Sequence, residues 1–162
     1  MDRPGIRCVD TRTGRDMIHA DASTTIRRPI ADVFSYVTDP TNEPAWHTDA
    51  AEARPLTAGP IGVGSHIAYV FPFMGRRSRS IGEVVAFEPP HLEAIHFDSG
   101  PFGLKPRITY HFEDLGGSVR FTRQAEADTP GLTRLIAPFM QRLLARQYVS
   151  FVENLRRRLE GA

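Results

Sequence analysis

Apolar and polar residues alternate through much of the chain, which is the period of a β-strand with one buried face. In the segment 107–112, Ile108, Tyr110 and Phe112 fall on one face and polar residues on the other. Proline and glycine clusters separate the alternating segments without room for helices between them, and short strands joined by turns predict an antiparallel meander. The expected strands cover residues 17–27, 52–56, 66–71, 79–87, 92–97, 107–112 and 119–127.

Between the first two strands the spacing of apolar residues becomes helical, which predicts two short helices. The first begins at Pro29, whose fixed φ suits a first helical turn. It ends at the dipeptide Asp39-Pro40, because the residue before a proline disfavours the α region. The second is expected over residues 41–46, with Thr41 or Asn42 as its cap.

The last part of the chain predicts one long amphipathic helix. Asp128 or Thr129 is expected to cap it, with Pro130 in its first turn and Gly161 at its end. Apolar residues recur along it at spacings of three, four and seven, which places them on one wide stripe. The stripe comprises Leu132, Leu135, Ile136, Phe139, Met140, Leu143, Leu144, Tyr148, Phe151, Val152, Leu155 and Leu159.

The composition is that of one soluble globular domain. The chain has 162 residues, of which 41% are hydrophobic and 24% charged, and its formal net charge is +1. Residues 1–16 mix arginines with aspartates and lack the apolar core of a secretory signal. We therefore expect a poorly ordered N-terminal extension, followed by a single domain over residues 17–162 and a cytoplasmic location.

The same composition excludes several classes of function. The balanced charge gives no field that would attract nucleic acid, and no apolar run is long enough to insert stably in a membrane. Cys8 is the only cysteine, which excludes an internal disulfide and a zinc site of clustered thiolates. The six histidines show no metal-ligand spacing. We expect neither a metal nor a cofactor.

The order of the elements predicts an α+β fold in which a curved antiparallel sheet of about seven strands grips the long C-terminal helix. A single antiparallel sheet needs a cover on one face, and only the last helix is long enough to provide it. The two short helices then close one end. The space between sheet and helix is either an apolar cavity or packed shut at native density.

Segments spread along the chain resemble the START-like superfamily, also called SRPBCC, helix-grip or Bet v 1-like, and in particular its polyketide cyclase/dehydrase branch. They are the helix PIADVFSYVTDP at 29–40, Trp46-His47, GPIGVGSHIAY at 59–69, VVAFEPPHLEAIHF at 84–97 and LGGSVRFT at 115–122, followed by the long helix. The resemblance covers residues 17–160. It implies a helix-grip fold around a deep hydrophobic pocket that binds lipids, polyketides or related molecules, and in some members catalyses cyclisation or dehydration.

On such a fold we expect a small hydrophobic ligand to contact aromatic and apolar side chains from the lid, the sheet and the last helix. For the strand at 66–71 either face fits the interior, because both carry apolar residues. The expected contacts are Trp46, Tyr69, Phe71, Ile108, Tyr110, Phe112, Phe121, Arg123, Phe139, Met140, Leu143 and Tyr148.

Arg123 is the most informative of these residues. The alternation of its strand places it on the same face as Phe121 and Ala125, so that a guanidinium points toward the cavity if this face is the concave one. A buried charge needs a partner, which is either an anionic group of a ligand or a carboxylate of the chain such as Glu83; in the remaining alternative the side chain extends to solvent at the rim. Tyr110, on the neighbouring strand, is a candidate hydrogen-bond donor beside it or a plain core residue.

The catalytic residues are unknown, and Arg123, Tyr110, His66 and His96 are the candidates. Both histidines belong to the meander, and Asp98 shares a strand face with His96 and can orient its ring for acid–base work. The alternative is a solvated histidine at the rim.

Three functions follow, and the sequence leaves all of them open. The first is binding of a lipid, polyketide or aromatic metabolite in an internal cavity, driven by apolar burial. The second is a cyclase or dehydrase that uses the polar groups of the same cavity. The third is an interaction protein with a collapsed cavity. We expect a monomer or a homodimer.

Overall fold

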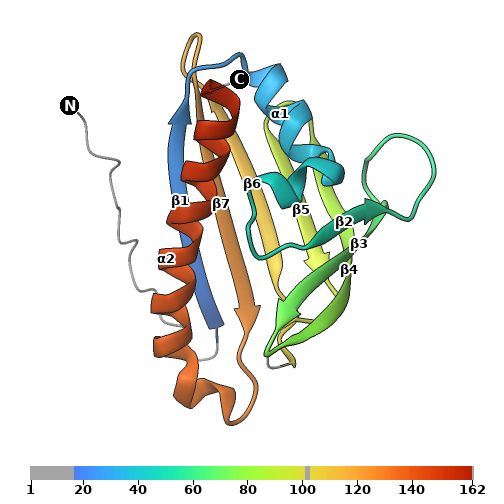
Figure 1. The fold of residues 1–162 in the computed structure, drawn as a ribbon, viewed down its shortest axis with the longest axis vertical. Helices are drawn as coiled ribbons and strands as arrows, with labels where there is room; N and C mark the ends of the chain where they lie inside the picture. The colour runs from blue at the N-terminus through green and yellow to red at the C-terminus, as the bar shows by residue number, and fades with distance from the viewer. Residues whose placement is uncertain (1–16, 101–102, 162) are drawn as a thin grey trace.

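The computed structural model describes residues 17–100 and 103–161, so the predicted extension at 1–16 lies outside the described residues. The chain forms β1 (Met17–Ile26), α1 (Ile30–Thr38), the 3₁₀ helix η1 (Pro40–Ala45), β2 (Glu52–Pro55), β3 (His66–Phe73), β4 (Arg76–Glu88), β5 (Leu92–Phe97), β6 (Arg107–Asp114), β7 (Val119–Asp128) and α2 (Thr133–Glu160). Figure 1 shows α2 lying along β1 and β7, with α1 and η1 toward one end of the sheet.

The described strands form one curved, seven-stranded antiparallel sheet in the order β1-β7-β6-β5-β4-β3-β2. Each strand from β2 to β7 pairs with its neighbour in sequence, which is the predicted meander, and β1 joins the far edge beside β7. The helix-grip fold and the number of strands are therefore confirmed.

The inward faces follow the predicted alternation where the sequence was clear. On β7, Phe121, Arg123 and Ala125 are buried, as the alternation predicted. On β3 the structure resolves the open choice, because Ile67 and Tyr69 are buried whereas His66 is exposed.

The hairpin between β3 and β4 is tighter than the sequence indicated. The predicted strands end at residue 71 and begin again at residue 79, but the observed strands continue through the residues between, and Phe73 pairs with Arg76. The two residues between, Met74 and Gly75, both have positive φ, at 49° and 74°. Two such residues in succession form the turn whose twist matches that of the flanking strands, so pairing extends to the tip.

Two predicted helix caps were wrong. Asp39, not Thr41 or Asn42, caps η1, because its carboxylate accepts a hydrogen bond from the backbone N–H of Thr41 at 3.0 Å. The last helix begins at Thr133, and among the described residues no side chain caps it. The expected start near 128–130 fails because Asp128 is still paired with β1, as the last residue of β7.

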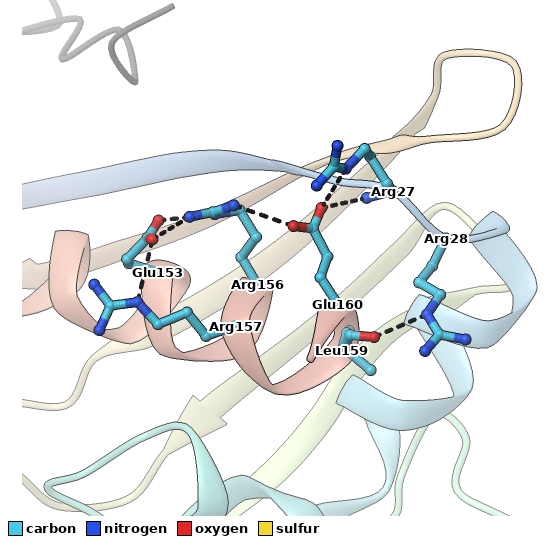
Figure 2. Close-up of polar contacts among 7 residues, drawn as sticks. All are labelled: Arg27, Arg28, Glu153, Arg156, Arg157, Leu159 and Glu160. Atoms are coloured by element: carbon cyan, nitrogen blue, oxygen red, sulfur yellow. Dashed lines mark hydrogen bonds and ion pairs between the residues drawn. The ribbon is translucent and has the colours of Figure 1, made fainter. Parts of the chain in front are cut away.

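The C-terminal end of α2 is fixed by polar contacts to the segment after β1 (Figure 2). Glu160 accepts a hydrogen bond from the backbone N–H of Arg27 at 2.8 Å and another from Arg156 at 3.1 Å. Arg28 donates to the backbone carbonyl of Leu159 at 2.8 Å, where a helix favours positive charge. These contacts hold the second half of α2 in place over the sheet.

The first half of α2 is covered much less. Tyr148 and Phe151 pack in the main core, and Met140 belongs to a smaller apolar cluster. Leu135 and Phe139, in contrast, are exposed. The apolar stripe that the sequence predicts as one buried face is therefore buried mainly in the second half of α2, and much of it is exposed in the first half.

The concave face leaves no room for a side chain at Gly82 of β4. A Cβ at this position would lie 2.6 Å from Cγ2 of Ile95 and 3.1 Å from the ring of Tyr69. We expect Gly82→Ala to lower the free energy of unfolding in urea by about 1–3 kcal/mol, because overpacked cores force their neighbours to move. Gly62→Ala is the control, since a Cβ there meets nothing within 4 Å. Equal stabilities of the two variants would contradict this packing.

Candidate functional site

Three polar side chains lie in one row across the concave face of the sheet. The strand register pairs Glu93 of β5 with Tyr110 of β6, and Tyr110 with Arg123 of β7. All three are buried, with exposed fractions of 1% for Glu93 and 4% for Arg123. Side chains at paired positions of neighbouring strands lie on the same face and contact one another. The register itself therefore brings a carboxyl, a phenol and a guanidinium together.

The η1 segment brings two more polar groups to this row. Glu43 lies in η1, and His47 follows it four residues later in the sequence. The backbone N–H of His47 donates to the carbonyl of Glu43 at 2.8 Å, which brings the two side chains to the same side. Both side chains are buried, as is Trp46 between them. The ring of Trp46 meets those of Tyr110 and Phe121 edge-on, which anchors η1 on the sheet.

Arg123 and His47 form the central contact of the site. Nη2 of Arg123 lies 3.2 Å from Nε2 of His47. A guanidinium only donates, so Nε2 must accept, and the imidazole proton must be on Nδ1. Nδ1 lies 3.8 Å from Oε1 of Glu43, too far for a hydrogen bond, and this oxygen accepts a long hydrogen bond of 3.5 Å from the hydroxyl of Tyr110. We call Glu43, His47, Tyr69, Glu93, Tyr110 and Arg123 the interior polar cluster.

The second half of α2 covers this cluster with aromatic rings. The guanidinium carbon of Arg123 lies 4.1 Å from the ring centre of Tyr148 and 5.4 Å from that of Phe151. The ring of Phe151 also packs against His47, with centres 4.2 Å apart. A cation over aromatic faces is stabilised by the ring quadrupoles, more so when water is excluded.

Burial sets the protonation states of the cluster. It raises the pKa of Glu43 to about 7, although the charge of Arg123 acts in the opposite direction. Burial also holds the pKa of Glu93 well above its ordinary value, with the nearby Glu43 adding to the effect. Burial and then the charge of Arg123 lower the pKa of His47, which is therefore neutral.

Arg123 remains the cation of this cluster. Burial opposes its charge, but Tyr148, Tyr110 and Glu43 together raise its pKa above the ordinary value. Because the pKa of Glu43 is about 7, this carboxyl is only about half ionised at neutral pH and does not fully balance the positive charge of Arg123.

Several buried polar atoms of the site lack a hydrogen-bond partner among the described residues. They include Nε and Nη1 of Arg123, Nε1 of Trp46 and Oε1 of Glu93. The hydroxyl of Tyr69 lies near enough to Glu43 to affect its pKa, but not in hydrogen-bonding geometry. An unsatisfied buried polar group costs about 1–3 kcal/mol. Nε and Nη1 lie on different edges of the planar guanidinium, so either nitrogen can donate a hydrogen bond to an oxygen of a guest molecule.

The structure brings most of the predicted contact residues together, but not all. Two of them, Phe139 and Leu143, are exposed on α2, away from the core, and Met140 packs in the smaller cluster. Phe71 packs at the edge of the main core. The remaining predicted contacts lie in or against the main core: Trp46, Tyr69, Ile108, Tyr110, Phe112, Phe121, Arg123 and Tyr148.

The two histidines considered as catalytic candidates do not join Arg123 and Tyr110. His66 and His96 are exposed, and the buried residues next to them in sequence, Ile67 and Ile95, face the core instead. The suggested partner of Arg123, Glu83, pairs with His66 in the register and is likewise exposed.

Sequence reasoning missed the three groups that complete the cluster. Glu93 had a usable signal, because it alternates with Ile95 and Phe97 and so belongs to the inward face of its strand. Glu43 and His47 had a weaker one, their four-residue spacing around Trp46. Nothing in the sequence indicates that η1 docks these two side chains against Arg123.

Two surface hollows in the described part of the chain lie away from this cluster. A surface hollow of about 610 Å³ lies between Arg28, Asp32 and the end of α2, and a smaller one of about 320 Å³ follows β7. Neither is lined by a residue of the interior polar cluster.

Within residues 17–100 and 103–161, no group of three or more potential ligands is arranged for a metal ion. No helix of this part is long and apolar enough to cross a membrane.

Comparison with solved structures shows the same fold in several proteins. The aromatase/cyclase Zhui from Streptomyces sp. R1128 is 12% identical, with a TM-score of 0.73 over 89% of this chain and 94% of that one. A START superfamily protein from Mycobacterium smegmatis is 15% identical, with a TM-score of 0.72 over 88% of this chain and 97% of that one. TTHA0849 from Thermus thermophilus is 16% identical, with a TM-score of 0.71 over the same shares of 88% and 97%.

At these identities the likeness shows the fold alone, and no curated protein matches the chain. A family model, in contrast, matches the sequence itself over residues 17–160, which include every strand and helix of the structure. Its description is "Polyketide cyclase / dehydrase and lipid transport". The chain belongs to this polyketide cyclase/dehydrase and lipid transport family.

Proposed function

We propose that the protein binds a small, mainly apolar molecule between the sheet and α2, and that it holds an anionic or enolic oxygen of this molecule at Arg123. The observation that carries the proposal is the pair of buried nitrogens, Nε and Nη1 of Arg123, without a hydrogen-bond partner among the described residues. Family membership supports the apolar character of the guest.

The surroundings of Arg123 favour a guest with an apolar body and one polar end. Tyr148 and Phe151 lie over the guanidinium, and Phe121 is buried beside it on the same strand. Apolar atoms of a guest gain about 25 cal/mol for each Å² removed from water against such rings. A lipid, a polyketide or an aromatic metabolite with a carboxylate or enolate combines these two properties.

Entry of the guest requires movement of part of α2, because aromatic side chains fill the concave face beneath its second half. That second half is fixed at Glu160 and Leu159 (Figure 2). The first half buries little apolar surface, with Phe139 and Leu143 exposed. We therefore expect guests to enter beneath the first half of α2.

Substitution of Arg123 tests this proposal. We expect the wild-type protein to bind a fluorescent polyene fatty acid more tightly than the methyl ester of the same acid. Arg123→Met keeps the apolar stem and removes the charge, so it should weaken binding of the acid about tenfold or more, since a hydrogen bond to a charged group contributes about 1.5–3 kcal/mol. Binding of the ester should change little. Both affinities are measured by fluorescence titration.

The matched control is Arg120→Met, on the same strand but on the outer face, where Arg120 pairs with Glu113 at 2.7 Å. This variant should bind acid and ester as the wild type does. Urea unfolding of each variant establishes that it is folded. An Arg123→Met variant that is folded and keeps the preference for the acid would contradict the proposal.

Glu43 favours a second candidate function, catalysis of a cyclisation or dehydration. A carboxyl with a pKa of about 7 is half ionised at neutral pH, as a general base requires, and Arg123 lies close enough to stabilise an enolate. In this reaction the carboxylate of Glu43 takes a proton from carbon next to a carbonyl of the substrate, and Arg123 balances the negative charge that forms on the oxygen.

The pH profile of turnover distinguishes catalysis from binding alone. With a poly-β-ketone substrate, kcat/KM should rise with pH through about 7, because only ionised Glu43 accepts the proton. Glu43→Gln should abolish this rise and lower kcat/KM at least about a hundredfold. Glu83→Gln, on the outer face, should leave both unchanged. Binding without turnover at any pH would reject the enzyme and leave the carrier.

A further inference from the structure

The first half of α2 presents a row of large apolar side chains to solvent. Leu135 is 79% exposed and Phe139 73% exposed, and Leu132 and Leu143 continue the row in the two directions. Spacings of three and four residues place these side chains on one side of the helix. Single exposed apolar residues are ordinary, but a continuous row of this kind marks an interaction surface.

Within this part of α2, every charged residue is positive. From Thr133 to Val152, α2 contains Arg134, Arg142 and Arg146 and no aspartate or glutamate. The helical spacing places Arg142 and Arg146 beside the apolar row. Acidic residues appear in α2 only from Glu153 onward, toward the end that contacts Arg27 and Arg28.

The hairpin between β3 and β4 repeats this combination. Met74 at its tip is 85% exposed, and the exposed Arg76 and Arg79 follow it, while Arg77 pairs with Glu52. In Figure 1 this hairpin and the first turns of α2 lie toward the same end of the molecule, opposite to the C-terminus. We call this end the basic apolar end: Met74, Arg76, Arg79, Leu132, Leu135, Phe139, Arg142, Leu143 and Arg146.

The charge pattern favours one kind of partner. A second copy of this chain would bring arginines against arginines if the same surfaces met, which is unfavourable. An anionic lipid surface complements them instead. Helices with Leu and Phe on one side and arginines beside them lie at the boundary between headgroups and acyl chains, where apolar burial and attraction to phosphates add together.

We propose that the basic apolar end docks peripherally on anionic lipid bilayers. Phe139, Leu135 and Met74 enter the headgroup region, and the arginines of α2 and of the hairpin lie at the level of the phosphates. The docking is interfacial, since no described helix is able to span a bilayer. It also goes beyond the proposed function, because it depends on the outer surface of the fold and not on Arg123.

Sedimentation with vesicles tests this docking. We expect the protein to bind vesicles of phosphatidylcholine and phosphatidylglycerol in equal parts, and not vesicles of phosphatidylcholine alone. Each of the substitutions Arg142→Gln and Arg146→Gln should lower the partition coefficient about fivefold, as expected for one basic residue at an anionic surface. Phe139→Ser should lower it further, because it removes the most exposed aromatic side chain of the helix. Added salt should weaken binding of the wild type.

Two control variants test whether the place of the residue matters. Val63→Ser removes an exposed apolar side chain in the segment between β2 and β3, and Arg158→Gln removes an exposed arginine at the other end of α2. Both should bind vesicles as the wild type does, and circular dichroism should show all variants folded. Because all of these residues are exposed, loss of the fold is not expected.

Three results would overturn the proposal. The first is equal binding to vesicles with and without phosphatidylglycerol. The second is equal loss of binding in the control variants and in Phe139→Ser. The third is a dimer in light scattering that dissociates in Phe139→Ser, together with no vesicle binding by the wild type, which would assign the row to a second copy of this chain.

Discussion

The burial of one positive charge on the concave face of the sheet determines how the rest of the interior is built. Arg123 lies in the middle of β7, where a guanidinium away from water requires acceptors and compensating charge. The chain supplies a neutral histidine at 3.2 Å, a carboxyl that is only partly ionised and two aromatic rings. This compensation is incomplete, because two of the nitrogens of Arg123 have no partner among the described residues. The proposed guest completes it.

The helix that covers this charge has two halves with different surroundings. Its second half is attached through Glu160 to Arg27 in the segment after β1, and it packs Tyr148 and Phe151 over the cluster. Its first half keeps Leu135 and Phe139 in solvent, although the sequence places them in the same apolar stripe. The division separates two tasks: the second half shapes the interior, and the first half provides the proposed entry route and the proposed surface for lipid. A guest taken from a bilayer would then enter where the helix is least restrained.

The sequence predicted the fold well, because strand alternation and helical spacing are local signals. Alternation also predicted the inward direction of Arg123. The same rule applies to Glu93, which shares a strand face with the buried residues Ile95 and Phe97. It failed where the outcome depends on contacts between distant segments. The docking of η1, which brings His47 to Arg123, is one such contact. The fraction of α2 that the sheet covers also depends on distant contacts, since an apolar stripe in the sequence does not show how much of the stripe is buried.

The side chain of Arg123 itself can be observed by NMR spectroscopy, through the resonance of its Nε–H group. A buried Nε–H exchanges slowly with water, and loss of its signal in Arg123→Met assigns it. We predict that addition of a fatty acid shifts this resonance strongly and that the methyl ester shifts it little, because only the carboxylate forms a charge-assisted hydrogen bond with the guanidinium. A resonance that stays unchanged while the fatty acid binds in the interior would show that the guest is held elsewhere and would contradict the role proposed for Arg123.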